Sequence, residues 1–172
     1  EEIKKLAKNI PNLIANNLVN SGVFRLLDRQ AYMQKPEALR NRPKFRDWRI
    51  IDAQTLISGN IIQKSQNKIS VNIELWDVYG ERRMLGITLS SNIRSWRRIG
   101  HIFSDKVYER LTGETGYFDT RIVYISESGE PKTRIKRLAI MDQDGANHQY
   151  LTDGKSLVLT PRFSPNKELI TF

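Results

Sequence analysis

The last third of the chain constrains its fold most, because short apolar segments and tight turns alternate there at close intervals. Turn sequences stand at 128–131, 142–147 and 152–154, and each one separates two apolar or alternating segments. Strands at such spacing, with turn residues between them, are typical of repeated β units. We therefore expect strands over residues 121–126, 135–141, 149–151 and 163–172. The sequence stops inside an apolar strand, so we also expect it to be a fragment of a longer protein.

The first part of the chain has the pattern of an α/β domain with a mixed sheet and two main helices. We expect a frayed segment before Asn9, then a helix with Pro11 in its first turn that ends at Gly22. The second main helix is expected over about residues 93–111, with Gly113 as its stop. Between these helices the pattern predicts strands over 23–28, 55–63, 69–75 and 84–91, and a short helix over 43–50.

Composition excludes several kinds of chemistry. The chain has no cysteine, so it has no disulfide, thiolate metal site or cysteine nucleophile. No apolar run approaches the ~18 residues needed to cross a bilayer. The only histidines are His101 and His148, and no glycine-rich phosphate loop or nucleophile elbow accompanies them. We therefore expect no catalytic residues, no cofactor and no metal.

Motifs in the tail and upstream of it resemble the TolB family. The tail carries Met141-Asp142-x-Asp144-Gly145-x-Asn147-x-x-x-Leu151-Thr152, followed by Pro161-x-Phe163-Ser164-Pro165-Asn166. The family's propeller repeat ends in Trp-Ser-Pro-Asp-Gly, whereas here Phe163 replaces Trp, and Asn166 and Lys167 replace Asp-Gly. Three upstream pieces also match, namely Asn20-Ser21-Gly22-x-Phe24-x-x-Leu27-Asp28-Arg29, the run Gly100-His101-x-x-Ser104-Asp105-x-Val107-Tyr108-Glu109-x-Leu111-Thr112-Gly113, and Thr120-Arg121-Ile122-x-Tyr124.

This resemblance implies an N-terminal α/β domain over residues 1–113, a linker over 114–120 and the first blade of a six-bladed β-propeller over 121–172. It implies a non-catalytic, periplasmic protein–protein interaction scaffold of the Tol–Pal envelope system. Such a scaffold links TolA with the lipoprotein Pal, maintains outer-membrane integrity and supports cell division. It would meet membranes only through its protein partners and would take no small-molecule substrate. The family's TolA-binding segment, a strand before the first helix and most of the Pal-binding propeller are expected to lie outside this sequence.

Two sets of candidate residues follow from this organisation. The first set lies in the segment expected to transmit between the domains: Leu111, Gly113, Gly116, Thr120 and Arg121. The second set is structural and forms the turns of the propeller repeat: Asp142, Asp144, Gly145, Asp153, Ser164 and Pro165. The same three aspartates have some likeness to a calcium loop, but Asx turns that close hairpins are the better account.

A third candidate set is a basic patch with interleaved aromatic residues, made of Arg40, Arg42, Lys44, Arg46 and Arg49. Cations and rings in this mixture can bind nucleic acid, which is the main alternative function. The plainer interpretation is a solvated face with Phe45 and Trp48 packed on the sheet, and nucleic acid is the less favoured partner. A further alternative is the non-catalytic propeller part of a peptidase, whose hydrolase domain would lie elsewhere.

Two features of the second main helix have both a functional and a structural interpretation. His101 and Asp105 are four residues apart and can touch, as a general base and its orienting carboxylate do. A hydrogen bond on the helix surface is the favoured interpretation. Trp96, Ile99, Phe103 and Val107 form a stripe at helical spacing, and we expect it to be core rather than a docking surface.

Overall fold

The computed structural model describes residues 1–35, 38–39, 42–166 and 169–172. The chain divides into two compact units, Glu1–Phe118 and Asp119–Phe172. The domain limits and linker predicted from the sequence stay predictions. The structural boundary nevertheless places residues 114–118 in the first unit.

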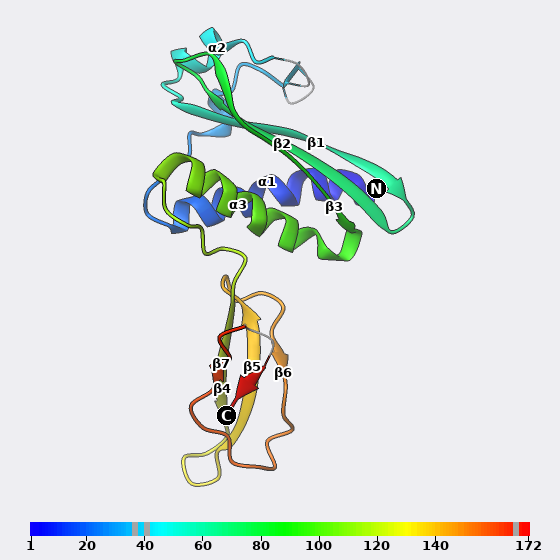
Figure 1. Ribbon diagram of the computed structural model, residues 1–172, viewed down its shortest axis with the longest axis vertical. Helices are drawn as coiled ribbons and strands as arrows, with labels where there is room; N and C mark the ends of the chain where they lie inside the picture. Colours follow the sequence, from blue (N-terminus) through cyan, green and yellow to red (C-terminus); the bar gives the residue numbers. More distant parts are fainter. Residues whose placement is uncertain (36–37, 40–41, 167–168) are drawn as a thin grey trace. The chain divides into compact units, whose positions relative to one another are not determined.

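The first unit is a three-stranded antiparallel sheet with two long helices on one face (Figure 1). Strands β1 (Thr55–Ser65), β2 (Lys68–Asp77) and β3 (Arg82–Asn92) form a meander in chain order. The helices are α1 (Glu2–Asn20) and α3 (Trp96–Thr112), and η3 (Ile93–Ser95) leads into α3. The predicted α/β class with two main helices is confirmed.

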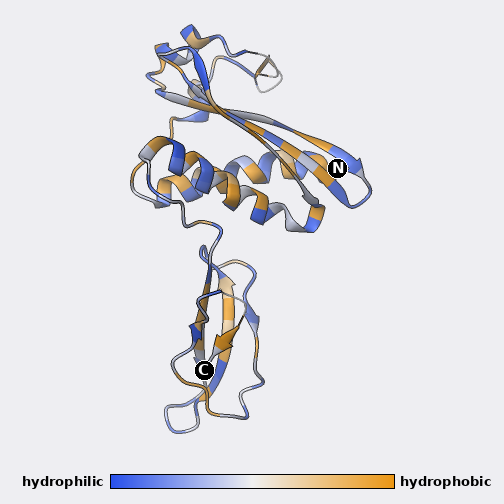
Figure 2. Ribbon diagram, viewed as in Figure 1, coloured by the Kyte–Doolittle hydropathy of each residue, from blue (hydrophilic) through white to orange (hydrophobic). Residues whose placement is uncertain are grey.

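Alternation along the strands explains why the sheet has one covered face. In β2, Ile69, Val71, Ile73 and Leu75 are buried against the helices, and polar residues stand between them. Figure 2 shows hydrophobic and hydrophilic residues alternating along these strands. The helices contribute Ile10, Ile14 and Leu18 from α1, and Ile99, Phe103 and Val107 from α3. The stripe on α3 is thus core, as predicted, with Trp96 partly buried at its start.

Two local predictions for the first unit are wrong. Helix α1 begins at Glu2 instead of near Asn9, because Leu6 continues the apolar stripe and is buried in the core. Pro11 therefore lies inside the helix, where its missing N–H leaves the Ala7 carbonyl without a helical partner. Both Ala7 and Pro11 are exposed, so water can bond to that carbonyl.

The strand expected over residues 23–28 does not form, and both described strand pairings of the sheet are antiparallel. The apolar residues of this segment are buried by other contacts. Phe24 packs edge-on against Tyr108, with ring centroids 6.1 Å apart. Leu27 packs on a second, smaller core made of Trp48, Ala53, Leu56 and Val78. Helix α2 (Phe45–Ile50) supplies Trp48, and η1 (Arg29–Ala31) precedes it.

The second unit consists of short antiparallel ribbons. Strands β4 (Arg121–Ser128), β5 (Ile135–Asp142) and β6 (Gln149–Tyr150) form one sheet, while β7 (Arg162–Phe163) pairs with β8 (Ile170–Thr171). The first three predicted strands therefore match closely, whereas the stretch 163–172 contains two short strands that pair with each other instead of one strand. In the described part of this unit the buried apolar residues are Leu138, Ala139 and Val158. Several large apolar side chains are exposed, including Leu157 at 75% and Leu169 at 68%.

Candidate interaction surfaces

The end of α3 is built to hold the segment that follows it. Gly113 adopts a left-handed conformation, with φ at 81°, and its N–H donates to the Glu109 carbonyl at 2.9 Å. Thr112 bonds back to the Tyr108 carbonyl at 2.8 Å, and the Glu114 N–H donates to the Thr112 hydroxyl at 3.1 Å. The chain is therefore turned back toward α3 immediately after the helix ends.

Residues 114–118 then pack on α3; we call this segment the return segment. The Phe118 N–H donates to the Asp105 carboxylate at 2.6 Å, and the Phe118 side chain is only 1% exposed. At Gly116 the backbone passes so close to Asp105 that an added Cβ would overlap the aspartate's own backbone. Only glycine fits there without displacing one of the two segments.

An aromatic cluster completes this contact. Phe118 packs edge-on against Tyr108 at 5.8 Å and stacks on Tyr117 at 4.6 Å. The Tyr108 hydroxyl donates to the Glu114 carboxylate at 3.4 Å. Burial and then the Glu114 charge raise the pKa of the Tyr108 hydroxyl above its usual value. Tyr117 and Phe118 are not among the residues predicted from the sequence, and Asp105 is considered there only as a partner of His101. The aromatic pair directly after Gly116 is the sequence signal that could have indicated this contact.

The predicted interdomain residues are divided between the two units. Leu111, Gly113 and Gly116 lie on α3 and the return segment of the first unit. Thr120 and Arg121 lie in the second unit. The Thr120 carbonyl accepts the Gln143 N–H at 3.2 Å, and Arg121 stands opposite Asp142 in the register of strands β4 and β5. Their role in transmission between the domains stays a prediction.

The predicted turn residues lie in or beside the turns of the second unit, and Asp142 is the last residue of β5. The Asp142 carboxylate accepts the Asn147 amide at 2.6 Å, and the Asp144 carboxylate accepts the Ala146 N–H at 3.2 Å. Gly145 is left-handed at φ 83° and donates to the Asp142 carbonyl. The Asp153 carboxylate accepts the Lys155 N–H at 3.0 Å. The bonds of Asp144 and Asp153, each to the N–H two residues further on, are those of Asx turns.

The Ser164-Pro165 turn is closed in the same way. The Ser164 N–H donates to the Leu169 carbonyl at 2.8 Å, and the Leu169 N–H donates to the Ser164 hydroxyl at 3.1 Å. Asn166 lies where the family repeat carries aspartate, and its side-chain oxygen accepts the Ser164 hydroxyl at 2.5 Å. The departure from the repeat therefore keeps a hydrogen-bonded turn.

The predicted basic patch is partly neutralised by one carboxylate. Arg49 forms an ion pair with Glu81 at 2.7 Å, and Arg42 donates to the Glu81 carbonyl at 2.8 Å. Arg42 also stands over the Phe45 ring at 5.3 Å. Lys44 and Arg46 are exposed, and Arg40 lies outside the described residues. This arrangement agrees with a solvated face packed on Phe45 and Trp48.

His101 has a structural environment rather than the expected place on the helix surface. It is 3% exposed, and its Nδ1 accepts the Asn17 amide at 3.0 Å. The same amide donates to the Ser104 hydroxyl at 2.9 Å, and that hydroxyl donates to the Gly100 carbonyl. This network ties α1 to α3, because Asn17 is the α1 member and the others are on α3.

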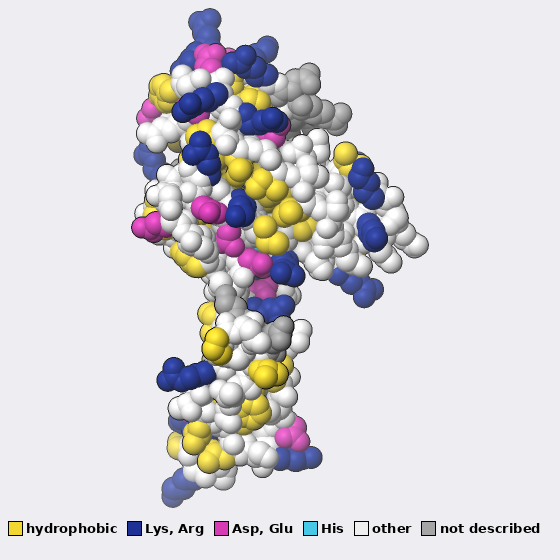
Figure 3. Space-filling view, in the orientation of Figure 1, with side chains coloured by type: hydrophobic (Ala, Val, Ile, Leu, Met, Phe, Trp, Pro, Cys, Tyr) yellow, Lys and Arg dark blue, Asp and Glu magenta, His cyan; other side chains and the backbone are white. Residues whose placement is uncertain are grey.

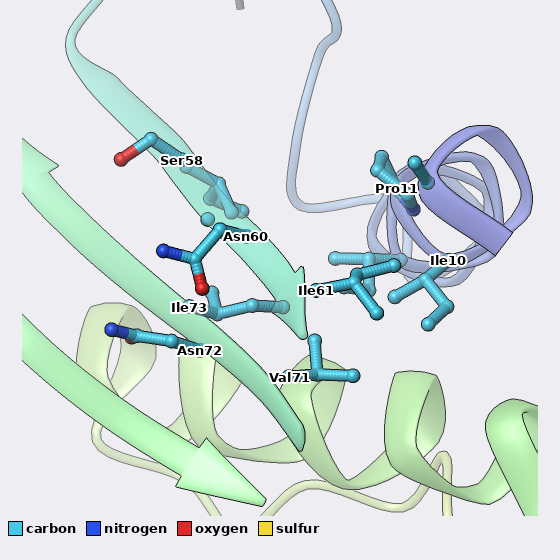
Figure 4. A pocket seen from close by; sticks show the side chains of 12 residues that line it. Ile10, Pro11, Ser58, Asn60, Ile61, Val71, Asn72 and Ile73 are labelled. Atoms are coloured by element: carbon cyan, nitrogen blue, oxygen red, sulfur yellow. The ribbon is translucent and has the colours of Figure 1, made fainter. Parts of the chain in front are cut away.

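An apolar groove lies between α1 and the edge strand β1 (Figure 4). Its cavity has a volume of about 130 Å³ and is lined by Ile10, Pro11 and Ile14 from α1 and by Ile57, Ile61 and Val71 from the sheet. In the close-up, Ile10, Ile61 and Val71 point toward one another, whereas Ser58, Asn60 and Asn72 lie on the other side of the sheet. The groove holds no cluster of polar groups suited to catalysis.

Comparison with known proteins covers both units. Residues 1–84 match the family model described as the TolB amino-terminal domain, and residues 108–172 match the TolB beta propeller domain. The chain is 48% identical to "Tol-Pal system protein TolB" of Pelagibacter ubique over 100% of this chain and 40% of that protein. It is 47% identical to the protein of the same name from Paramagnetospirillum magneticum, over 98% of this chain and 38% of that protein.

The fold has a match among solved structures. The crystal structure of TolB from Acinetobacter baumannii superposes with a TM-score of 0.83, covers 94% of this chain and is 23% identical in sequence. The chain spans about 40% of that protein, as it does of the curated relatives. None of the described helices is long and apolar enough to span a membrane.

Proposed function

The chain consists of a TolB amino-terminal domain followed by the beginning of a TolB β-propeller domain, and from this we propose that it belongs to a non-catalytic scaffold of the Tol–Pal system. The identity of 48% along the whole chain to a Tol-Pal system protein TolB carries this proposal. The scaffold works in the periplasm, links TolA with Pal, maintains outer-membrane integrity and supports cell division, as the resemblance to the family implies.

The proposed mechanism is coupling between the two partners through the end of α3 and the residues that follow it. The return segment supports this role, because its contacts give the chain a defined exit from the first unit. Phe118 is buried and bonded to Asp105, so residues 114–118 follow any displacement of α3. The return segment therefore moves with α3 up to the point where the second unit begins, at Asp119.

The test is complementation by a chimaera. These 172 residues replace the matching part of TolB from Paramagnetospirillum magneticum, which supplies the rest of the protein. In a strain of that organism without its own TolB, we expect the chimaera to restore resistance to detergents that a damaged outer membrane admits. A chimaera that is exported and folded but restores no resistance would contradict the proposal.

A further inference from the structure

One end of the first unit gathers cations from three separate segments. Ser65 pairs with Lys68 across the β1–β2 hairpin, and Lys68 also pairs with Asn92 at the end of β3. The Ile93 N–H donates to the Asn67 carbonyl at 2.9 Å, which fixes the start of η3 beside the hairpin. Lys64, Lys68 and Arg94 therefore lie at the same end of the sheet.

The two long helices begin at this end as well. Leu13 lies against Gly100, and Asn17 bonds to Ser104, so α1 and α3 run in the same direction. Ala7 and Ile10 line the same groove as Ile61 and Val71, in the half of the sheet nearest the hairpin. The first turns of α1 thus add their lysines to those of the hairpin. We call this surface the basic end; it consists of Lys4, Lys5, Lys8, Lys64, Lys68, Arg94, Arg97 and Arg98.

The basic end has few carboxylates to offset it. The sequence has no acidic residue between Asp52 and Glu74, or between Glu81 and Asp105, so the segments that form the basic end contain only two acidic residues, Glu1 and Glu2. Within the described part of the chain no ion pair involves Lys64, Lys68 or Arg94, in contrast to Arg42 and Arg49, which share Glu81. Figure 3 shows dark-blue side chains over the hairpin without a magenta one among them on that face.

The basic end is a surface and not a cleft. The linings of the apolar groove and of the small polar cavity beside Leu39 include none of its cations. All of these side chains except Arg97 are exposed. Ile62, 51% exposed, stands next to the hairpin, and Trp96, partly buried at the start of α3, carries Arg97 over its ring at 5.5 Å. Flexible cations around an exposed aliphatic side chain, with no groove among them, suit a broad, diffuse anionic surface.

We propose that the basic end binds the anionic surface of a lipid bilayer through the phosphates of its headgroups. This inference is independent of the proposed scaffold function. Each cation close to such a surface strengthens binding about fivefold at low salt, and a cluster of this size is enough for measurable binding. The attraction acts within about one Debye length and weakens as salt rises.

The experiment measures binding of the 172-residue chain to vesicles of phosphatidylglycerol and phosphatidylcholine, and to vesicles of phosphatidylcholine alone. The test variant is Lys64→Gln, Lys68→Gln, Arg94→Gln. The matched control, Arg25→Gln, Lys44→Gln, Arg46→Gln, removes the same charge from exposed positions outside the basic end. A third variant, Lys64→Arg, Lys68→Arg, keeps the charge of the hairpin.

We expect binding to the anionic vesicles only, lost as salt is raised and weakened on the order of 100-fold in the test variant. The control and the arginine variant should bind like the parent chain. No binding to anionic vesicles at low salt would overturn the proposal, as would an equal loss in the control. Binding of polyglutamate without binding of vesicles would also overturn it, and would assign the basic end to an acidic protein.

Discussion

The Asp105 carboxylate accepts the backbone N–H of Phe118 at 2.6 Å, and this bond holds the return segment on α3. Asp105 sits in the middle of the helix, so the contact joins two positions that are 13 residues apart. The buried Phe118 ring and the close approach at Gly116 support the same geometry. The connection from the first unit to the propeller strands is therefore part of the fold of the first unit.

Removal of this acceptor should release the return segment. We expect Asp105→Ala to lower the free energy of unfolding of the first unit by about 1–3 kcal/mol, because the substitution removes the acceptor and leaves the Phe118 N–H without it. Asp105→Asn keeps an oxygen acceptor and should cost less. Hydrogen exchange at the Phe118 amide checks this, and unchanged protection in Asp105→Ala would contradict it.

The polar network between the helices should be required for stability. Asn17→Ala removes the donor to His101 and Ser104, both buried, and should destabilise the chain by about 1–3 kcal/mol. Asn16→Ala, on the exposed side of the same helix, serves as the matched control and should change stability by less than about 0.5 kcal/mol. Urea unfolding of both variants measures the difference. Equal midpoints for the two would show that the network contributes nothing.

The Asp77 carboxyl in the β2–β3 turn should titrate at low pH. The Gly80 N–H, which it accepts at 2.8 Å, and to a smaller extent Arg82 lower the pKa of this carboxyl below its usual value of 3.8. Because the pKa of Asp77 is lower in the folded chain than in the unfolded chain, its ionised carboxylate stabilises the fold at pH values above the unfolded pKa. This stabilisation is lost as the pH falls through the pKa of the folded state.

An NMR titration distinguishes the two causes of the lowered Asp77 pKa. Arg82→Gln should leave the Asp77 pKa lowered, because the backbone donor remains. Gly80→Ala should raise it toward the usual value, since the added methyl group would collide with the carboxylate. The opposite pattern would assign the lowered pKa to the exposed ion pair instead.

The second unit should be the more protease-sensitive part of the chain. Its described residues bury little apolar surface, and among them the outer sides of the edge strands β4 and β6 pair with no further strand. We expect limited proteolysis to cut within residues 121–172 well before residues 9–113. Equal protection of the two parts would contradict this.

Local patterns in the sequence predicted most of the fold, because apolar residues recur at every second position in β2 and at every third or fourth position in α3. The alternation from Ile69 to Leu75 and the stop at Gly113 are set by backbone geometry and burial on one face. The start of α1 was less predictable, since burial of Leu6 outweighs the charged residues beside it and the proline at position 11. The segment 23–28 was mistaken for a strand because apolar residues alone do not distinguish pairing from packing on Tyr108.

The candidate surfaces were less accessible to such analysis, because they depend on contacts between distant residues. Glu81 lies more than 30 residues from Arg42 and Arg49, so its neutralisation of the basic patch has no local signal. The same holds for the bond from Asn17 to His101 and for the convergence of three segments at the basic end.

Coupling between TolA and Pal can be measured in the chimaera with the Paramagnetospirillum magneticum protein. Pal affinity is measured with and without saturating TolA in three forms: the parent, Gly116→Ala and Gly86→Ala. The methyl group at position 86 meets only the Arg83 side chain, at 3.5 Å, so this variant is the matched control.

We expect TolA to change Pal affinity in the parent and in Gly86→Ala, and to change it at least severalfold less in Gly116→Ala, whose return segment is displaced. An identical effect of TolA in all three forms, with Gly116→Ala correctly folded, would contradict coupling through the return segment.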